Sequence, residues 1–122
     1  AEFGVPGDVV KGAILVSGLY DLAPVQQTTP NDWLSLSAAE AAALSPQYRL
    51  PAASTRLCVA TAETDTAEFK RQSLDYAAAC RQQGCAVHYL DVPGRNHFDV
   101  IMDWMNPQAA LTQAAWALFD PA

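Results

Sequence analysis

Three segments of the chain have the hydrophobic pattern of buried strands. Residues 12–18 (GAILVSG) form a continuous apolar run with β-branched members between two glycines, and residues 56–62 (RLCVATA) form a second apolar run. Uninterrupted runs of this length are typical of parallel strands that are covered on both faces. Residues 85–92 (CAVHYLDV) alternate between two sets of side chains, which predicts a third strand.

Two helices are predicted from their start and stop signals. Ser37 and Glu40 form a capping box that opens a short alanine-rich helix, which ends near Leu44. Residues 67–83 follow the second strand with the spacing of an amphipathic helix. Gly84 is suited to end this helix, because glycine adopts the left-handed conformation without a steric penalty.

A third helix is predicted near the end of the chain. Asn106 followed by Pro107 provides an N-cap and a proline at the first helical position. The buried stripe of this helix is expected to consist of Leu111, Ala114, Ala115 and Leu118. Between the first two strands, residues 19–55 are rich in turn-forming residues and are interpreted as a cap-like excursion that includes the short helix.

The order of these elements predicts an α/β fold with a parallel sheet and helices on both faces. No repeat or linker divides the sequence, so residues 1–122 are interpreted as part of one domain. Three strands alone would leave an apolar sheet edge unpaired, which natural proteins avoid. We therefore expect an incomplete sheet, with a missing N-terminal half in the same chain or in a companion chain.

Composition excludes several classes of function. The net charge of −6, with scattered Lys and Arg residues, argues against a nucleic-acid-binding protein. No apolar run reaches the roughly 18 residues of a membrane helix, and no signal peptide is visible. Cys58, Cys80 and Cys85 are odd in number and lack metal-ligand spacing, so no disulfide framework, metal site or cofactor is expected. A cytoplasmic location is the simplest interpretation, and a homo-oligomer stays open.

Titratable residues follow the second and third predicted strands. Glu63 and Asp65 come directly after residues 56–62, and His97 follows the third strand in the segment 93–99. The carboxyl ends of parallel strands meet at one edge of a sheet, where ligands and catalytic groups gather. A carboxylate and an imidazole placed there can form the acid and base of a catalytic triad. The local pattern favours Asp65 as the acid but leaves Glu63 as a rival.

The segments TDTAEFKRQSLDYAAAC and VPGRNHFDVI resemble the C-terminal part of the arylformamidase (kynurenine formamidase) and carboxylesterase branch of the α/β hydrolases. The resemblance implies that Asp65 is the triad acid and that His97, followed by Phe98 and Asp99, is the triad histidine. Ala67 stands where that family usually has proline. In α/β hydrolases the triad runs in the order serine, acid, histidine, which agrees with an acid and a histidine near the C-terminal end.

The nucleophile of that family is missing from the sequence. It occurs in a Gly-x-Ser-x-Gly turn between a strand and a helix, and no such motif exists in the chain. Ser17 precedes Gly18 at the end of a strand, but Leu15 occupies the position of the first glycine. We therefore expect the serine to lie upstream of residue 1, and this chain alone to be inactive.

The sequence thus favours a serine hydrolase of carboxylic esters or arylformamides, acting on a small-molecule substrate through an acyl-serine intermediate. Two alternatives stay open: a fragment of a peptidase similar to the prolyl oligopeptidases, and a non-catalytic interaction module on a hydrolase scaffold. Trp33, Trp104 and Trp116 are expected to be packing residues, although Trp104 and Met102 could also line a substrate pocket. His88, inside the third strand, is expected to have no catalytic role.

Overall fold

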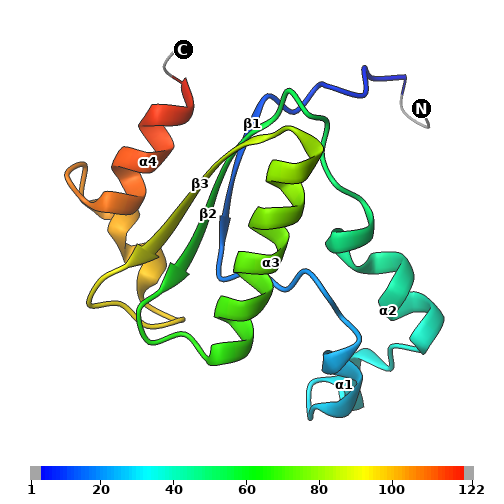
Figure 1. The fold of residues 1–122 in the computed structure, drawn as a ribbon. Coiled ribbons are helices and arrows are strands. Elements are labelled where there is room, and N and C mark those ends of the chain that lie inside the picture. Colours follow the sequence, from blue (N-terminus) through cyan, green and yellow to red (C-terminus); the bar gives the residue numbers. More distant parts are fainter. Residues whose placement is uncertain (1–3, 120–122) are drawn as a thin grey trace.

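Three parallel strands lie side by side in the computed structural model, which describes residues 4–119 (Figure 1). The strands are β1 (Gly12–Val16), β2 (Arg56–Ala62) and β3 (Ala86–Val92), in the order β1-β2-β3. Arg56, at the start of β2, pairs with Gly12 on one side and with Ala86 on the other. The carboxyl ends of all three strands therefore reach the same edge, and the predicted three-stranded parallel sheet is confirmed.

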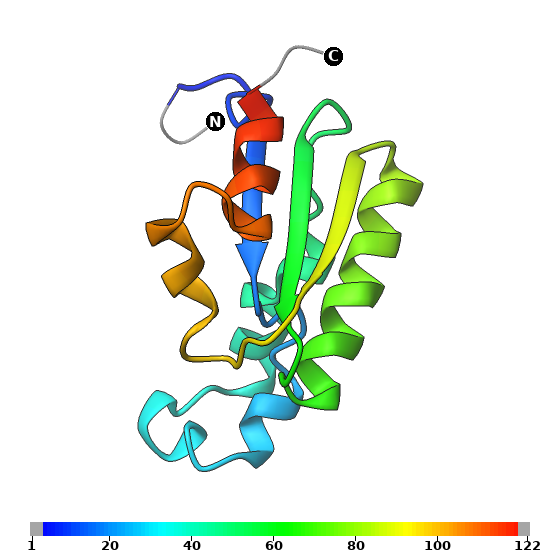
Figure 2. The same cartoon turned by 90° about the vertical axis from the view of Figure 1, so that its left-hand side faces the viewer.

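Helices cover both faces of this sheet. The helix that joins β2 to β3, α3 (Ala67–Gln83), packs on one face, and the last helix, α4 (Ala110–Phe119), packs on the other (Figures 1 and 2). Gly84 ends α3 with a φ of 102°, as its position in the sequence predicts. The connection from β2 through α3 to β3 is a βαβ unit, so the loops after β2 and β3 lie at neighbouring strand ends.

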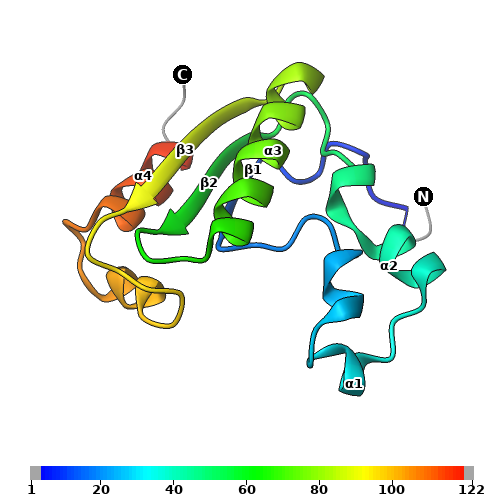
Figure 3. The ribbon, with the colours of Figure 1, turned by 60° about the horizontal axis from the view of Figure 1, so that its bottom comes forward.

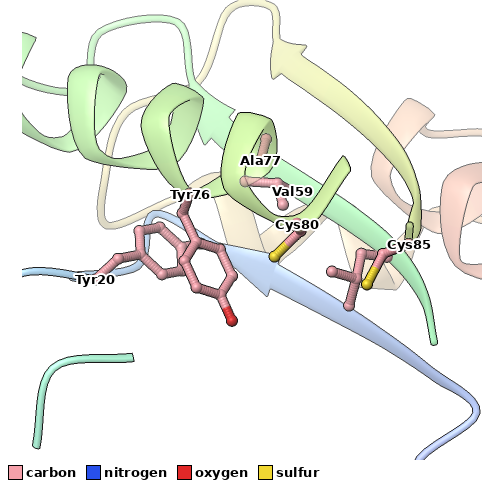
Figure 4. Packing of buried hydrophobic residues seen from close by; sticks show 7 residues of the cluster. Tyr20, Val59, Tyr76, Ala77, Cys80 and Cys85 are labelled. Carbon is pink, nitrogen blue, oxygen red and sulfur yellow. The ribbon is translucent and has the colours of Figure 1, made fainter. Parts of the chain in front are cut away.

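The two faces of the sheet have separate cores. Tyr20 and Tyr76 stack on the α3 side with ring centroids 4.2 Å apart and planes inclined by 10° (Figure 4). The other buried residues of this cluster are Leu57, Val59, Ala77, Cys80 and Cys85. On the α4 side the buried residues are Ala60, Ala62, Val92, Val100 and Leu111. Alternate β2 positions supply the two cores, which is why the strand is apolar on both faces.

The segment between β1 and β2 carries two short helices, α1 (Asn31–Leu34) and α2 (Ala38–Leu44), on the side of the molecule away from α4 (Figure 3). The capping box predicted at the start of α2 is present, with Ser37 and Glu40 bonded to each other's backbone N–H groups. Gln72 of α3 ties down the start of this segment, because its side-chain oxygen accepts the N–H groups of Tyr20 and Asp21, each at 2.8 Å.

Three predicted boundaries differ from the structure. The strand β1 ends at Val16 and not at residue 18, because Ser17 adopts the left-handed region with a φ of 46°. The strand β3 begins at Ala86, one position later than predicted. The helix α4 begins at Ala110 and not at Pro107, because Asn106 opens a separate turn in which its carbonyl accepts the Ala109 N–H at 3.0 Å. In that turn the Asn106 side chain accepts the Gln108 N–H at 3.0 Å.

Large apolar side chains are exposed over much of the described surface. The expectation that the three tryptophans are packing residues is wrong: Trp33 is 82% exposed, Trp104 43% and Trp116 60%. Phe98, which follows His97, is 87% exposed. Within residues 4–119, no helix combines the length and the apolar character needed to span a bilayer.

Candidate active site

Asp65 lies in the tight turn that joins β2 to α3. Its backbone N–H donates to the Ala62 carbonyl at 3.0 Å, and Thr66 then forms the N-cap of α3 by accepting the Phe69 N–H. Because Thr66 performs the capping, the carboxylate of Asp65 is free to point away from the helix. The Asp65 side chain is fully buried at the carboxyl edge of the sheet.

Three donors surround the Asp65 carboxylate. His97 Nδ1 lies 2.9 Å from Oδ1, within the hydrogen-bond range expected for a triad pair. The Ser17 hydroxyl donates to Oδ2 at 2.6 Å, and the Ala62 N–H donates to the same oxygen at 2.8 Å. One carboxylate oxygen therefore faces the histidine, while the other is held by the ends of β1 and β2.

The charge of Asp65 depends on these contacts. Burial raises the pKa of the carboxyl, because a low-dielectric environment disfavours the ionised form. Hydrogen bonds from Ser17, Ala62 and His97 outweigh burial and bring the pKa below its usual value. The carboxylate is consequently ionised at neutral pH, which is the form that accepts an Nδ1 proton and stabilises an imidazolium.

His97 is more accessible than its partner. Its side chain is 38% exposed and lies between two aromatic rings, with Phe69 at a centroid distance of 4.5 Å and Phe98 edge-on at 5.4 Å. No hydrogen bond to the second ring nitrogen, Nε2, is present among residues 4–119. A cavity of about 420 Å³ adjoins the ring, and its lining consists of Thr64, Asp65, Thr66, Phe69, Asn96, His97 and Phe98. Trp104 and Met102 are not among these lining residues.

The loop that carries His97 is fixed by its own polar residues. Asn96 accepts the Phe98 N–H at 2.8 Å and donates its side-chain amide to Asp99 at 2.9 Å. Arg95 forms an ion pair with the buried Asp103 at 2.8 Å, and this pair joins the loop to the segment before α4. Arg95 and Asn96 therefore hold the loop in shape, while the imidazole itself stays open to the cavity.

Glu63, the rival acid, does not contact His97 in the structure. Its carboxylate accepts the backbone N–H of Gly94, and its own N–H donates to the Val92 carbonyl at 3.0 Å. Glu63 thus links the loop after β2 to the loop after β3. His88, the other histidine of the chain, is exposed on β3 and takes no part in the site.

Ser17 is the site residue that sequence reasoning missed. The sequence motif bears only on whether Ser17 is a nucleophile, whereas the structure places its hydroxyl on the acid. The sequence holds a signal for this role, because Ser17 lies at the carboxyl end of a predicted parallel strand and therefore at the same sheet edge as Asp65 and His97. Within the described residues, no group of three or more His, Cys, Asp or Glu side chains is arranged to hold a metal ion.

No protein-family model matches the chain. Its fold resembles a crystal structure from Silicibacter sp. that is provisionally described as a thioesterase, with a TM-score of 0.69. The two share 21% sequence identity over 88% of this chain and 39% of the other, a similarity that concerns the fold alone.

Two curated relatives are more similar in sequence. The chain is 37% identical over 110 residues to the kynurenine formamidase of Salmo salar and 36% identical over 109 residues to that of Danio rerio. In both comparisons 85% of this chain is matched, and it spans 37% of the length of the relative. The resemblance to the kynurenine formamidases that the two sequence motifs indicated is therefore confirmed over most of this chain, which corresponds to one part of those proteins.

Proposed function

We propose that this chain supplies the acid and the histidine of a Ser–His–Asp triad in a hydrolase of arylformamides or carboxylic esters. The observation that carries the proposal is the 2.9 Å contact between Asp65 Oδ1 and His97 Nδ1 at the ends of neighbouring parallel strands. The similarity to kynurenine formamidases favours an arylformamide substrate over the peptide substrate of the prolyl-oligopeptidase alternative.

In the first half of the reaction, His97 Nε2 takes the proton of a serine hydroxyl while the serine oxygen attacks the formyl carbon. The ionised Asp65 keeps the remaining ring proton on Nδ1 and stabilises the imidazolium. His97 then returns its proton to the nitrogen of the leaving arylamine, and the formyl group stays on the serine as an ester. Water attacks this ester with His97 as the base, which releases formate and restores the serine.

The nucleophile in this proposal comes from a segment outside residues 1–122 or from a companion chain. None of the residues that line the cavity beside His97 is a serine or a cysteine. The two threonine hydroxyls there are already engaged: Thr64 donates to the Arg95 carbonyl at 3.2 Å, and Thr66 caps α3. The outer edges of β1 and β3 have no strand partner within residues 4–119, so the sheet of the complete enzyme would continue at one or both of them.

The proposal is tested with this chain and with a chimera. In the chimera, residues of this chain replace the 109-residue segment of the Danio rerio kynurenine formamidase to which they are similar. We expect the isolated chain to hydrolyse neither formanilide nor p-nitrophenyl acetate faster than its own His97→Ala variant. We expect the chimera to hydrolyse formanilide, with formate released in step with aniline.

Two results would contradict the proposal. One is hydrolysis by the isolated chain that disappears when one of its own serines is replaced by alanine, because the nucleophile would then lie inside residues 1–122. The other is a chimera that keeps its activity when His97 is replaced by glutamine. A chimera that folds and binds formanilide without turnover would favour the alternative of an interaction module.

A further inference from the structure

Ser17 occupies a strained position at the carboxyl end of β1. Its φ of 46° lies in the left-handed region, which is sterically unfavourable for a residue with a Cβ atom. Its N–H donates to the Ala60 carbonyl of β2 at 2.8 Å, so the strand pairing holds the residue in place. Backbone strain of this kind persists only where the surrounding structure requires it, and it concentrates at functional sites.

The strained backbone directs the hydroxyl of Ser17 at the buried acid. Ser17 Oγ lies 2.6 Å from Asp65 Oδ2, a short distance typical of a hydroxyl that donates to a carboxylate. With the Ala62 N–H on the same oxygen, two donors fix the rotation of the carboxylate about its side-chain bond. The other oxygen, Oδ1, is then left in the direction of His97 Nδ1.

We propose that Ser17 is a positioning residue that holds the Asp65 carboxylate in line with the His97 ring. The inference rests on the proposed function, because it assigns to Ser17 a part in orienting the same acid–histidine pair. Without the hydroxyl, one side of a buried carboxylate loses a donor, and the remaining N–H no longer determines which oxygen faces the histidine. Ser17 thus acts on the reaction through Asp65 and touches no reacting atom.

The geometry separates this role from that of a nucleophile. The hydroxyl of a nucleophilic serine donates a hydrogen bond to the histidine and then transfers its proton to it, whereas the Ser17 hydroxyl donates its hydrogen bond to the acid. The pKa of Asp65 is lowered in the folded chain, so this carboxylate is a poor base for activating a hydroxyl. Ser17 and His97 are bonded to different oxygens of Asp65, with the acid between them.

The test uses this chain and does not require turnover. Ser17→Ala removes the hydroxyl and keeps the Cβ, and Ser17→Gly removes the hydroxyl while relieving the left-handed strain. Ser35→Ala is the matched control, because Ser35 also has a positive φ, of 53°, but lies at the end of α1. The ¹³C signal of the Asp65 carboxyl and the ¹⁵N signals of the His97 ring are followed by NMR across a pH titration.

We expect both Ser17 variants to raise the measured pKa of Asp65 and to move the ¹⁵N signals of neutral His97 away from a single tautomer protonated at Nδ1. The Ser35→Ala signals should match those of the unmodified chain. The inference is overturned if the folded Ser17 variants leave the Asp65 titration and the His97 tautomer unchanged. It is also overturned if Ser17→Gly, which carries no strain, fails to fold, because the hydroxyl would then serve folding.

Activity gives a second and separable readout. In the formanilide-hydrolysing chimera, Ser17→Ala should lower kcat about tenfold with little change in KM, as expected for the loss of one hydrogen bond to a charged group. An active chimera with normal kcat after Ser17→Ala refutes the positioning role but leaves the triad standing. The opposite combination is also informative. If the Ser17 variants change the NMR signals of Asp65 but the activity of the chimera does not depend on His97, the proposed function is refuted and the contact between Ser17 and Asp65 is retained.

Discussion

Asp65 and His97 lie in the loops that follow two neighbouring strands of one sheet, yet the structure surrounds them very differently. The Asp65 side chain has no exposed surface and receives three hydrogen bonds from three separate elements. The His97 side chain is 38% exposed, has one hydrogen bond, and otherwise contacts the rings of Phe69 and Phe98. The acid belongs to the packed interior, whereas the histidine lies at its boundary with solvent.

This difference corresponds to what each side chain is proposed to do. A carboxylate that must stay ionised and fixed benefits from convergent donors in a buried place. An imidazole that must exchange protons with substrate and water needs an accessible nitrogen and a ring that can adjust slightly. If the two side chains have these separate roles, substitutions of Asp65 and of His97 should lower activity by similar factors. Substitutions of Asp65 should lower stability more than substitutions of His97.

The largest expected effect is on catalysis. In the formanilide-hydrolysing chimera, Asp65→Asn and His97→Gln should each lower kcat by about 10⁴-fold, because either change deprives the serine of a correctly protonated base. The measurement is steady-state release of aniline. His88→Gln is the control, since His88 is the other histidine of the chain and lies exposed on β3, so it should keep full activity.

The second-largest expected effect is on the free energy of unfolding, and it should differ between Asp65 and His97. Asp65→Ala should lower the free energy of unfolding of this chain by about 1–3 kcal/mol, because it leaves the Ser17 hydroxyl and the Ala62 N–H without their acceptor. His97→Ala should lower it less, because removing the partly exposed ring opens Asp65 Oδ1 to water, which can replace the lost donor. Urea unfolding followed by circular dichroism measures both values. If the two variants lose equal amounts of unfolding free energy, the difference in burial between the two side chains does not determine their contribution to stability.

A smaller effect concerns pH. The pKa of Asp65 is lower in the folded chain than its usual value, so its contribution to stability is complete above about pH 4. That contribution is lost as the pH falls through the folded-state pKa. The unmodified chain should therefore lose its advantage over Asp65→Asn as urea unfolding is repeated at decreasing pH. An advantage that grows toward acid pH would show that the folded state holds the protonated acid.

The smallest effect on stability is expected at the contact between the loop after β2 and the loop after β3, where Glu63 accepts the Gly94 N–H. Glu63→Gln keeps an oxygen that can accept the Gly94 N–H but removes its charge, so the free energy of unfolding should change by no more than about 0.5 kcal/mol. The local consequence is faster hydrogen exchange of the Gly94 amide, measured by NMR. Asp75→Asn, on the exposed side of α3, removes a charge elsewhere and should leave that amide unchanged.

Much of the fold could be predicted because its signals are local. The apolar runs of the strands, the capping box at Ser37 and the glycine after α3 each follow from a few adjacent residues. The nearness of Asp65 and His97 followed from topology, since parallel strands share a carboxyl edge. These features required no knowledge of side-chain packing.

The details that escaped prediction depend on contacts distant in sequence or on backbone shape. The hydrogen bond from Ser17 to Asp65 joins residues 48 positions apart and requires a left-handed backbone that serine rarely adopts. The late start of α4 arises because Asn106 satisfies its local hydrogen bonds in a turn, an alternative that the Asn-Pro pair does not distinguish from a helix cap. The exposure of the tryptophans could not be inferred from composition.

That exposure determines what an optical measurement on this chain reports. Trp33 and Trp116 are largely exposed and Trp104 is partly exposed, so we expect most of the indole emission of the folded chain to come from rings in contact with water. Unfolding will therefore shift the emission maximum little. A blue shift will instead record the covering of an indole, so the intrinsic emission of this chain is an assay for association with a second polypeptide.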